Sequence, residues 1–276
     1  MKPTNKIIVY DDSCPMCSVY TKAFVHAGLI EPSGRKSFSG INVEILKKID
    51  NHKCRNEIPL INTKTNNITY GIDALLDILG DKWPLIKNIG NFSAVNWLLK
   101  RLYNLVSYNR RVITATTFHE GNFDCTPDFN FKYRILFLCL GLSFNTFMLI
   151  PEFNFILTNS FLHESSLMQL QTAHFLLVLV NISVAYTLKN KEALEFLGQA
   201  NLLALLTTLL LLPLLLSNYF ARVPAAFNNT CLLLLLVFIV KEYKRRMVYA
   251  GVIPKNKHIV FVNIASVLSF LLYLIL

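Results

Sequence analysis

Two cysteines near the N-terminus, Cys14 and Cys17, have the type and spacing best suited to chemistry in this chain. They lie between a short apolar run, Lys6–Tyr10, and a run typical of a helix, Ser18–Leu29. Two intervening residues place both sulfur atoms on the first helical turn, close enough to form a disulfide. The first sulfur then meets the unpaired N–H groups of that turn, which favours the thiolate that attacks disulfides. We therefore predict a dithiol redox site, with Cys14 as the nucleophile and Cys17 as the resolving thiol.

Asp11 comes three residues before the first cysteine. A buried carboxyl group at this position could act as a general base that takes the proton of Cys17. It could equally cap the N-terminus of the helix, with Asp12 or Ser13 as competing caps. Acidic neighbours also oppose ionisation of Cys14, so the sequence leaves the pKa of this thiol open.

A structural zinc site is the alternative for the same two cysteines. Zn²⁺ takes four ligands, and His52 and Cys54 form a His-x-Cys pair that could supply the other two. Because a C-x-x-C pair followed by a helix is already explained by redox chemistry, we expect neither a metal nor another cofactor.

The elements that would position the cysteines follow the order β-α-β-α-β-β-α. Short β-branched runs predict four strands, at residues 7–10, 36–38, 58–61 and 68–70. Apolar residues at helical spacing predict helices over residues 14–29, 43–49 and 71–79, and a further helix over 92–106. Asn66-Asn67 marks the turn of a hairpin between the last two strands. This order is the thioredoxin arrangement, so the expected fold class of this part is α/β and thioredoxin-like.

Four stretches of the N-terminal part resemble the DCC family of thiol-disulfide oxidoreductases. Asp11, Cys14 and Cys17 match the Asp, Cys, Cys signature for which the family is named. The family's proline strand, its Gly-x-Asp-Ala helix start and its closing aromatic-Asn-Arg are similar to Ile58-Pro59-Leu60, Thr69-Tyr70-Gly71-x-Asp73-Ala74 and Tyr108-Asn109-Arg110. The match covers about residues 5–115 and departs at Asp12, where members often have Gly.

The resemblance implies dithiol/disulfide exchange with a protein or small-molecule thiol or disulfide, and no bound cofactor. It also implies that Pro59 is cis and lies against the disulfide, where its backbone would pair with an extended substrate strand. The alternative for Pro59 is an ordinary proline of an edge strand.

The second half of the chain is predicted to lie in a membrane. The chain has 53% apolar and only 16% charged residues, which is too apolar for an ordinary soluble protein. Five apolar runs approach the roughly 20 residues that a bilayer requires, at about residues 133–150, 169–188, 197–217, 228–243 and 258–276. We expect a dithiol domain over residues 1–115, a membrane-proximal linker over 116–132 and a helical transmembrane region over 133–276. No signal peptide is expected before the first strand.

The distribution of Lys and Arg predicts the orientation of the spans. Alternate loops are basic and carry Lys132 and Arg134, then Lys189 and Lys191, then six cations between Lys241 and Lys257. The opposite loops carry Glu152, Glu164 and only Arg222. Because a Lys/Arg excess marks the cytoplasmic side, we expect the N-terminal domain in the cytoplasm and the C-terminus outside. A cytosolic dithiol would rest reduced and act as a reductase or sensor.

Other cysteines and polar residues invite further hypotheses. A transmembrane relay would need a close pair, but Cys139 and Cys231 are expected at different depths, and lone cysteines in apolar helices usually serve packing. A disulfide between Cys125 and the C-x-x-C pair is a further option. Polar residues in the spans could mark a ligand path or bond helices together, and they are Asn145, His174, Asn181, Asn201 and Asn228. Among these, His174 is the first to test.

Three classes of function remain open at this point. The first is a membrane-anchored thiol-disulfide oxidoreductase. The second is a thioredoxin-like docking module with incidental cysteines, and the third is a small transporter or quinone-linked protein with a regulatory dithiol. Nucleic-acid binding is not expected, because the N-terminal half has no basic stripe interleaved with aromatic residues. The sequence does not determine the oligomeric state.

Overall fold

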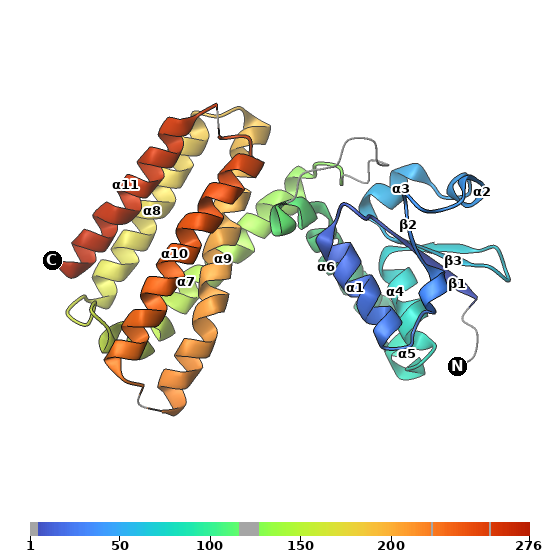
Figure 1. Ribbon diagram of the computed structural model, residues 1–276, viewed down its shortest axis with the longest axis horizontal. Helices are drawn as coiled ribbons and strands as arrows, with labels where there is room; N and C mark the ends of the chain where they lie inside the picture. Colours follow the sequence, from blue (N-terminus) through green and yellow to red (C-terminus); the bar gives the residue numbers. More distant parts are fainter. Residues whose placement is uncertain (1–4, 116–126, 222, 254) are drawn as a thin grey trace. The chain divides into compact units, whose positions relative to one another are not determined.

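The computed structural model describes residues 5–115, 127–221, 223–253 and 255–276 (Figure 1). The chain divides into two compact units, Met1–Arg134 and Ile135–Leu276. The division lies inside the first long apolar helix, two residues after the predicted start of the membrane region at residue 133.

A small mixed sheet forms the centre of the N-terminal unit. Within the described residues its strands are β1 (Lys6–Tyr10), β2 (Arg35–Ser37), β3 (Pro59–Asn62) and β4 (Ile68–Tyr70). Their order is β2-β1-β3-β4, with β1 parallel to β2 and antiparallel to β3, and β3 antiparallel to β4. The predicted hairpin between β3 and β4 is confirmed. Asn66 has φ +53° in its turn, a left-handed conformation that Asn tolerates.

Successive residues of β1 supply the two cores of this unit, because side chains alternate across a strand. Ile8 packs against Leu60 and Ile78 on one face of the sheet. Val9 packs against Phe38 and Cys54 on the other face. The helices divide in the same way, since α1 (Pro15–His26) and α4 (Gly71–Gly80) contribute to the first core and α2 (Val43–Leu46) to the second.

Several helices differ from the predicted ones. Both α3 (Asn51–Asn56) and α5 (Pro84–Asn91) form where no element was predicted. Asp50 starts α3 by accepting the N–H groups of His52 and Lys53, and the helix predicted over 43–49 ends early, at Leu46. The helix predicted to end at Val106 continues as α6 (Ser93–Thr114).

The C-terminal unit consists of long apolar helices. In the described residues there are five, namely α7 (Phe131–Phe155), α8 (Leu167–Tyr186), α9 (Asn190–Phe220), α10 (Ala225–Tyr249) and α11 (Lys257–Ile275). Each is long and apolar enough to cross a bilayer, which confirms the five predicted membrane helices. In Figure 1, α8 runs beside α11 and α9 runs beside α10.

Three of these helices, α7, α9 and α10, are longer than the predicted spans, and this changes two assignments. Pro151 lies inside α7, so Glu152, which was expected in a loop, is helical. The cluster from Lys241 to Arg246 was also expected in a loop but belongs to α10. Apolar content sets how much of a helix can lie in lipid, whereas backbone hydrogen bonding lets the helix continue past that length.

Candidate active site

Cys14 is the N-cap of α1, and Pro15 is the first residue of that helix. The Sγ atom of Cys14 accepts a hydrogen bond from the backbone N–H of Cys17 at 3.4 Å. Most N-caps use the oxygen of Ser, Thr, Asp or Asn for this bond, and here a sulfur atom takes its place. A thiolate at this position is favoured by the N–H group and by the positive end of the helix.

Both sulfur-bearing side chains are buried, with exposed fractions of 5% for Cys14 and 4% for Cys17. The first turns of α1 are held by Thr21, whose hydroxyl donates to the carbonyl oxygen of Cys17 at 2.7 Å and accepts from Nε of Arg35 at 3.0 Å. Arg35 begins β2, so the sheet fixes the start of α1.

The two thiols differ in their tendency to ionise. A hydrogen bond from the Cys17 thiol lowers the pKa of Cys14, although burial opposes this effect. The same hydrogen bond raises the pKa of Cys17 far above its usual range, and burial adds to the rise. A readily ionised thiol beside one that keeps its proton can attack a disulfide first and be resolved by its neighbour afterwards.

Asp11 lies directly after β1 and has an exposed fraction of 6%. Its Oδ1 atom accepts the N–H of Ser13 at 3.0 Å, and its backbone carbonyl accepts the N–H of Cys14 at 3.2 Å. Since Ser13 precedes the helix and Cys14 is the N-cap, Asp11 shapes the loop between β1 and α1 and does not cap α1. Burial raises the pKa of Asp11, and the charge of Arg110 opposes that rise.

Arg110 is a site residue to which the sequence analysis assigned no role. It is 7% exposed on α6, and its Nη2 atom lies 3.5 Å from Oδ2 of Asp11. Burial disfavours its charge, but electrostatic interactions with Cys17, Cys14 and Asp11 outweigh burial and raise the pKa of Arg110. A buried cation therefore lies beside both thiols and the carboxyl group.

A signal for Arg110 exists in the sequence. Tyr103, Ser107 and Arg110 recur at intervals of four and three residues, which places them on one face of α6. The hydroxyl of Tyr103 accepts the N–H of Ile58 at 2.9 Å, and the hydroxyl of Ser107 donates to the carbonyl oxygen of Asn56. Because the predicted helix ended at Val106, Ser107 and Arg110 were not placed on this face with Tyr103.

Pro59 is buried and is the first residue of β3. The edge-strand alternative is wrong, because β3 lies between β1 and β4. The first position of an inner strand tolerates the missing N–H of proline. Its neighbour Ile58 donates to Tyr103 and accepts the N–H of Gly71 at 2.9 Å. The entry to β3 is thus tied to the same face of α6 that carries Arg110.

The zinc alternative receives no support from the placement of its ligands. Cys54 packs in the core that includes Val9, on the opposite face of the sheet from α1, and His52 is exposed. Across the described residues, no group of three or more His, Cys, Asp and Glu side chains is arranged to hold a metal ion.

The remaining cysteines form no disulfide within the described part of the chain. Cys139 is exposed on α7, and Cys231 is partly exposed on α10. Cys125 lies outside the described residues, so its proposed disulfide with the C-x-x-C pair stays a prediction.

We call the C-terminal unit, with its five long apolar helices, the membrane unit. Its polar residues mostly bond one helix to another. The hydroxyl of Thr208 on α9 donates to Asn145 on α7 at 3.2 Å, and Asn201 on α9 donates to the carbonyl oxygen of Phe137 at 3.3 Å. His174 on α8 lies 3.1 Å from the Thr146 hydroxyl. Asn228 bonds to Asn218 and Asn159. Asn181 donates within its own helix to Leu177 and accepts from Asn263 on α11 at 3.5 Å. Hydrogen bonding between helices accounts for most of these residues.

Two cations that were counted for the orientation are buried, namely Arg134 on α7 and Arg246 on α10. Arg246 on α10 is 1% exposed, donates to Oε1 of Gln199 at 2.7 Å and places Nε 2.9 Å from Glu242. An internally paired arginine contributes to packing as well as to the charge of its helix end.

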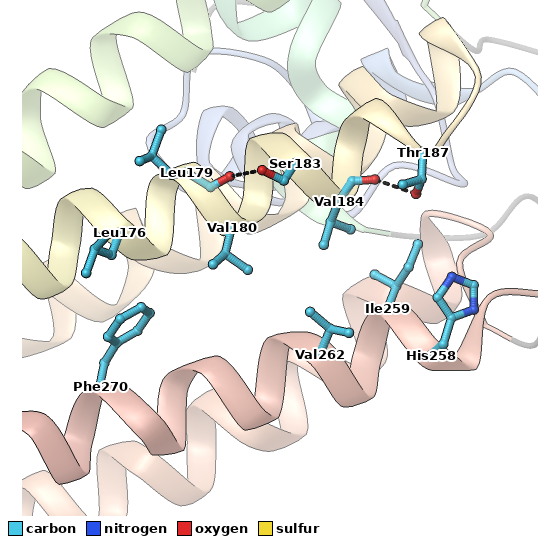
Figure 2. A pocket seen from close by; sticks show the side chains of 10 residues that line it. All are labelled: Leu176, Leu179, Val180, Ser183, Val184, Thr187, His258, Ile259, Val262 and Phe270. Carbon is cyan, nitrogen blue, oxygen red and sulfur yellow. Dashed lines mark hydrogen bonds between the residues drawn. The ribbon is translucent and has the colours of Figure 1, made fainter.

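An apolar groove of about 490 Å³ lies between α8 and α11, as Figure 2 shows. Val180, Val184, Ile259 and Val262 line its middle. The hydroxyls of Ser183 and Thr187 bond to carbonyl oxygens of their own helix, at 2.8 and 2.7 Å. With its hydroxyls engaged, this surface suits contact with lipid chains better than recognition of a polar ligand.

Comparison with models of protein families, with curated proteins and with solved structures finds no match to this chain.

Proposed function

We propose that this chain is a membrane-anchored thiol-disulfide oxidoreductase that exchanges dithiol and disulfide through Cys14 and Cys17. The observation that carries the proposal is the Sγ atom of Cys14 at the N-cap of α1, 3.4 Å from the N–H of Cys17. A buried thiol that is easily ionised, next to one that is not, has the reactivity that exchange requires.

The N-terminal unit is proposed to be a thioredoxin-like domain of the DCC type. Two observations support this: the strand order β2-β1-β3-β4 with one parallel and two antiparallel pairs, and a C-x-x-C pair between β1 and α1. The Gly of the Gly-x-Asp-Ala stretch also has a structural reason. Gly71 has φ +57°, and an added Cβ would come within 3.2 Å of the side chain of Glu57.

Exchange would proceed in two substitutions at sulfur. The thiolate of Cys14 attacks a substrate disulfide, so that a mixed disulfide forms and the first substrate sulfur leaves as a thiolate that takes up a proton. Cys17 then loses its proton and attacks the sulfur of Cys14, which forms the Cys14–Cys17 disulfide and releases the second substrate thiol. Two electrons pass from the dithiol to the substrate disulfide, and an external thiol reductant restores the dithiol.

Asp11 and Arg110 would assist different steps. The positive charge of Arg110 lowers the pKa of Cys14 and so favours the attacking thiolate. Asp11, whose pKa is raised by burial, would accept the proton of Cys17 when the mixed disulfide is resolved. Arg110 lies 3.5 Å from Asp11 and interacts electrostatically with both thiols. Its positive charge would therefore stabilise negative charge on the carboxylate and, after proton transfer, on the sulfur atoms.

An extended substrate segment would bind near the entry to β3. Pro59 has no N–H to offer and the carbonyl of Ile58 already accepts the N–H of Gly71, so such a strand would bind at this entry with few backbone hydrogen bonds. The fixed position of Ile58, held by Tyr103 and Gly71, supports this assignment.

The proposed orientation keeps the N-terminal unit in the cytoplasm and the C-terminus outside. Lys189, Lys191, Lys255 and Lys257 are exposed at one end of their helices, which supports the charge argument even though Arg246 is buried. In the reducing cytosol the dithiol would then act as a reductase or sensor.

Trapping with Cys17→Ser tests the proposal. Without its resolving thiol, the chain should accumulate mixed disulfides on Cys14 in intact membranes, and a reductant should release them. Cys17→Ser combined with Cys14→Ser should trap nothing. Cys54→Ser is the matched control, since Cys54 is equally buried but lies on the other face of the sheet. Equal alkylation rates for Cys14 and Cys54 would favour the docking-module alternative.

A further inference from the structure

The N-terminal unit has an apolar surface on α5 and the first half of α6 that its own core does not use. Among the described residues from 5 to 115, eleven large apolar side chains are exposed, and nine of them lie between Trp83 and Val106. We define the α5–α6 face by its six most exposed members: Leu85, Ile89, Phe92, Trp97, Leu98 and Leu102. Contiguous apolar surface of this kind marks an interaction site, whereas single exposed residues do not.

The α5–α6 face is held rigidly by the core. Gly90 of α5 packs so closely on α4 that an added Cβ would lie 2.4 Å from Leu76. On α6, the opposite side of the helix carries Tyr103, Ser107 and Arg110 to the dithiol site. The same helices therefore present an inner face to the core and an apolar face outward.

The charges around this face identify its partner. The segment from Lys82 to Val106 contains four Lys and Arg residues and no Asp or Glu. Lys87 and Lys100 pair with Asp77 and Asp73 of α4, so Lys82 and Arg101 supply the positive charge that faces outward. Two of the cations lie over the indole rings of the chain, Lys82 at 5.3 Å from the ring centre of Trp83 and Arg101 at 5.5 Å from that of Trp97. Trp with flanking Lys or Arg is typical of segments that lie in the headgroup region of a membrane.

We propose that the α5–α6 face binds the surface of an anionic bilayer, with Leu85, Ile89, Phe92 and Trp97 inserted below the headgroups. A protein partner would not need cations beside both tryptophans, whereas anionic lipid favours Lys82 and Arg101 at these positions. The chain's own apolar helices keep a bilayer within reach of the face, because residues 115–130 are the only chain between α6 and α7. Insertion would hold the dithiol unit at the membrane surface.

Fluorescence can test this in the full chain, because its only two tryptophans, Trp83 and Trp97, lie at this surface. The protein is placed in nanodiscs of phosphatidylcholine with phosphatidylglycerol, with bromine on the upper part of the acyl chains. We expect strong quenching by brominated lipid and weak quenching by aqueous acrylamide. Nanodiscs of phosphatidylcholine alone should quench less.

Substitutions test whether the α5–α6 face is responsible for the quenching by lipid. Leu85→Glu with Ile89→Glu should abolish most of the lipid quenching and raise acrylamide quenching, because carboxylates resist insertion beside anionic lipid. Val43→Glu is the matched control, since Val43 is 63% exposed on α2 and lies outside the face. Far-UV circular dichroism verifies that each variant is folded.

Two outcomes would overturn the proposal. Tryptophans quenched by acrylamide but not by brominated lipid would show that the face stays in water. Tryptophans protected from both quenchers would show that protein covers it, either another copy, a partner or the chain itself. Neither outcome bears on disulfide exchange, which is measured separately.

Discussion

The two units of this chain use buried polar groups in opposite ways. In the N-terminal unit, Asp11, Arg110 and two thiols converge at the start of one helix. In the membrane unit, buried polar side chains such as Asn145 and Thr208 are spread along the helices and join them in pairs. Convergent groups shift one another's pKa and can do chemistry, whereas isolated pairs supply packing specificity.

This contrast indicates that activity should be sought in the N-terminal unit. An amide or hydroxyl in a membrane helix reaches a partner on the next helix and is then satisfied. A carboxyl group, a guanidinium and two thiols around one helix N-cap shift one another's pKa, so their protonation states are coupled. The following predictions test whether chemistry is confined to the first unit.

Replacing Cys14 should have the largest effect. Cys14→Ser should abolish disulfide exchange in an insulin-reduction assay, because a hydroxyl in place of the sulfur is a far weaker nucleophile at neutral pH. Cys139→Ser, in the membrane unit, should leave the rate unchanged. Full turnover by Cys14→Ser would show that Cys14 is not needed for exchange and would contradict the assignment of chemistry to the N-terminal unit.

Arg110→Gln should destabilise the N-terminal unit strongly, because it leaves Asp11 buried without its cation. Breaking a buried ion pair costs about 3–5 kcal/mol. The pKa of Cys14 should rise, so that its alkylation begins at higher pH. Thermal melting followed by tryptophan fluorescence reports this unit, since both Trp residues lie in it.

A matched control lies on the same helix. Lys100 pairs with Asp73 at 2.8 Å, but both side chains are about half exposed. Lys100→Gln should therefore cost only about 0–1 kcal/mol. Equal losses for Arg110→Gln and Lys100→Gln would contradict a special role for the buried cation.

Asp11→Asn should slow release of mixed disulfides by about 10²-fold or more, the usual effect of losing a general base. It should also change the pH dependence of stability. Burial raises the folded-state pKa of Asp11 above 3.8, so ionising it costs folding free energy as pH rises through the folded pKa. The variant should therefore gain stability relative to the wild type as the pH rises above about 4. A difference that stays constant with pH would contradict the raised pKa.

The smallest effect is expected in the membrane unit. Thr208→Val removes the hydrogen bond to Asn145, which should cost about 0.6 kcal/mol in unfolding from mixed micelles. Thr207→Val is the control, because Thr207 bonds only to the carbonyl oxygen of Leu203 in its own helix. Neither change should alter the alkylation rate of Cys14. An altered rate would indicate that the two units are coupled.

Local pattern predicted much of the fold. Alternating and β-branched runs located all four strands within about one residue, and apolar length located the five membrane helices. Missed elements were those whose formation depends on a short cap or on packing. Asp50 starts α3 through two hydrogen bonds, and α5 depends on contact between Gly90 and Leu76.

By itself, the sequence determined the dithiol at a helix start, the elements that flank it and the apolar length of the second half. Each of these depends on residues close together in the chain, where hydrogen bonding and side-chain periodicity decide the result. Only the tertiary structure decided that Arg110 meets Asp11, that Cys54 lies across the sheet from Cys14, and that Pro59 opens an inner strand. Those relations arise when distant segments pack into one core, and no short-range pattern encodes which side chains then become neighbours.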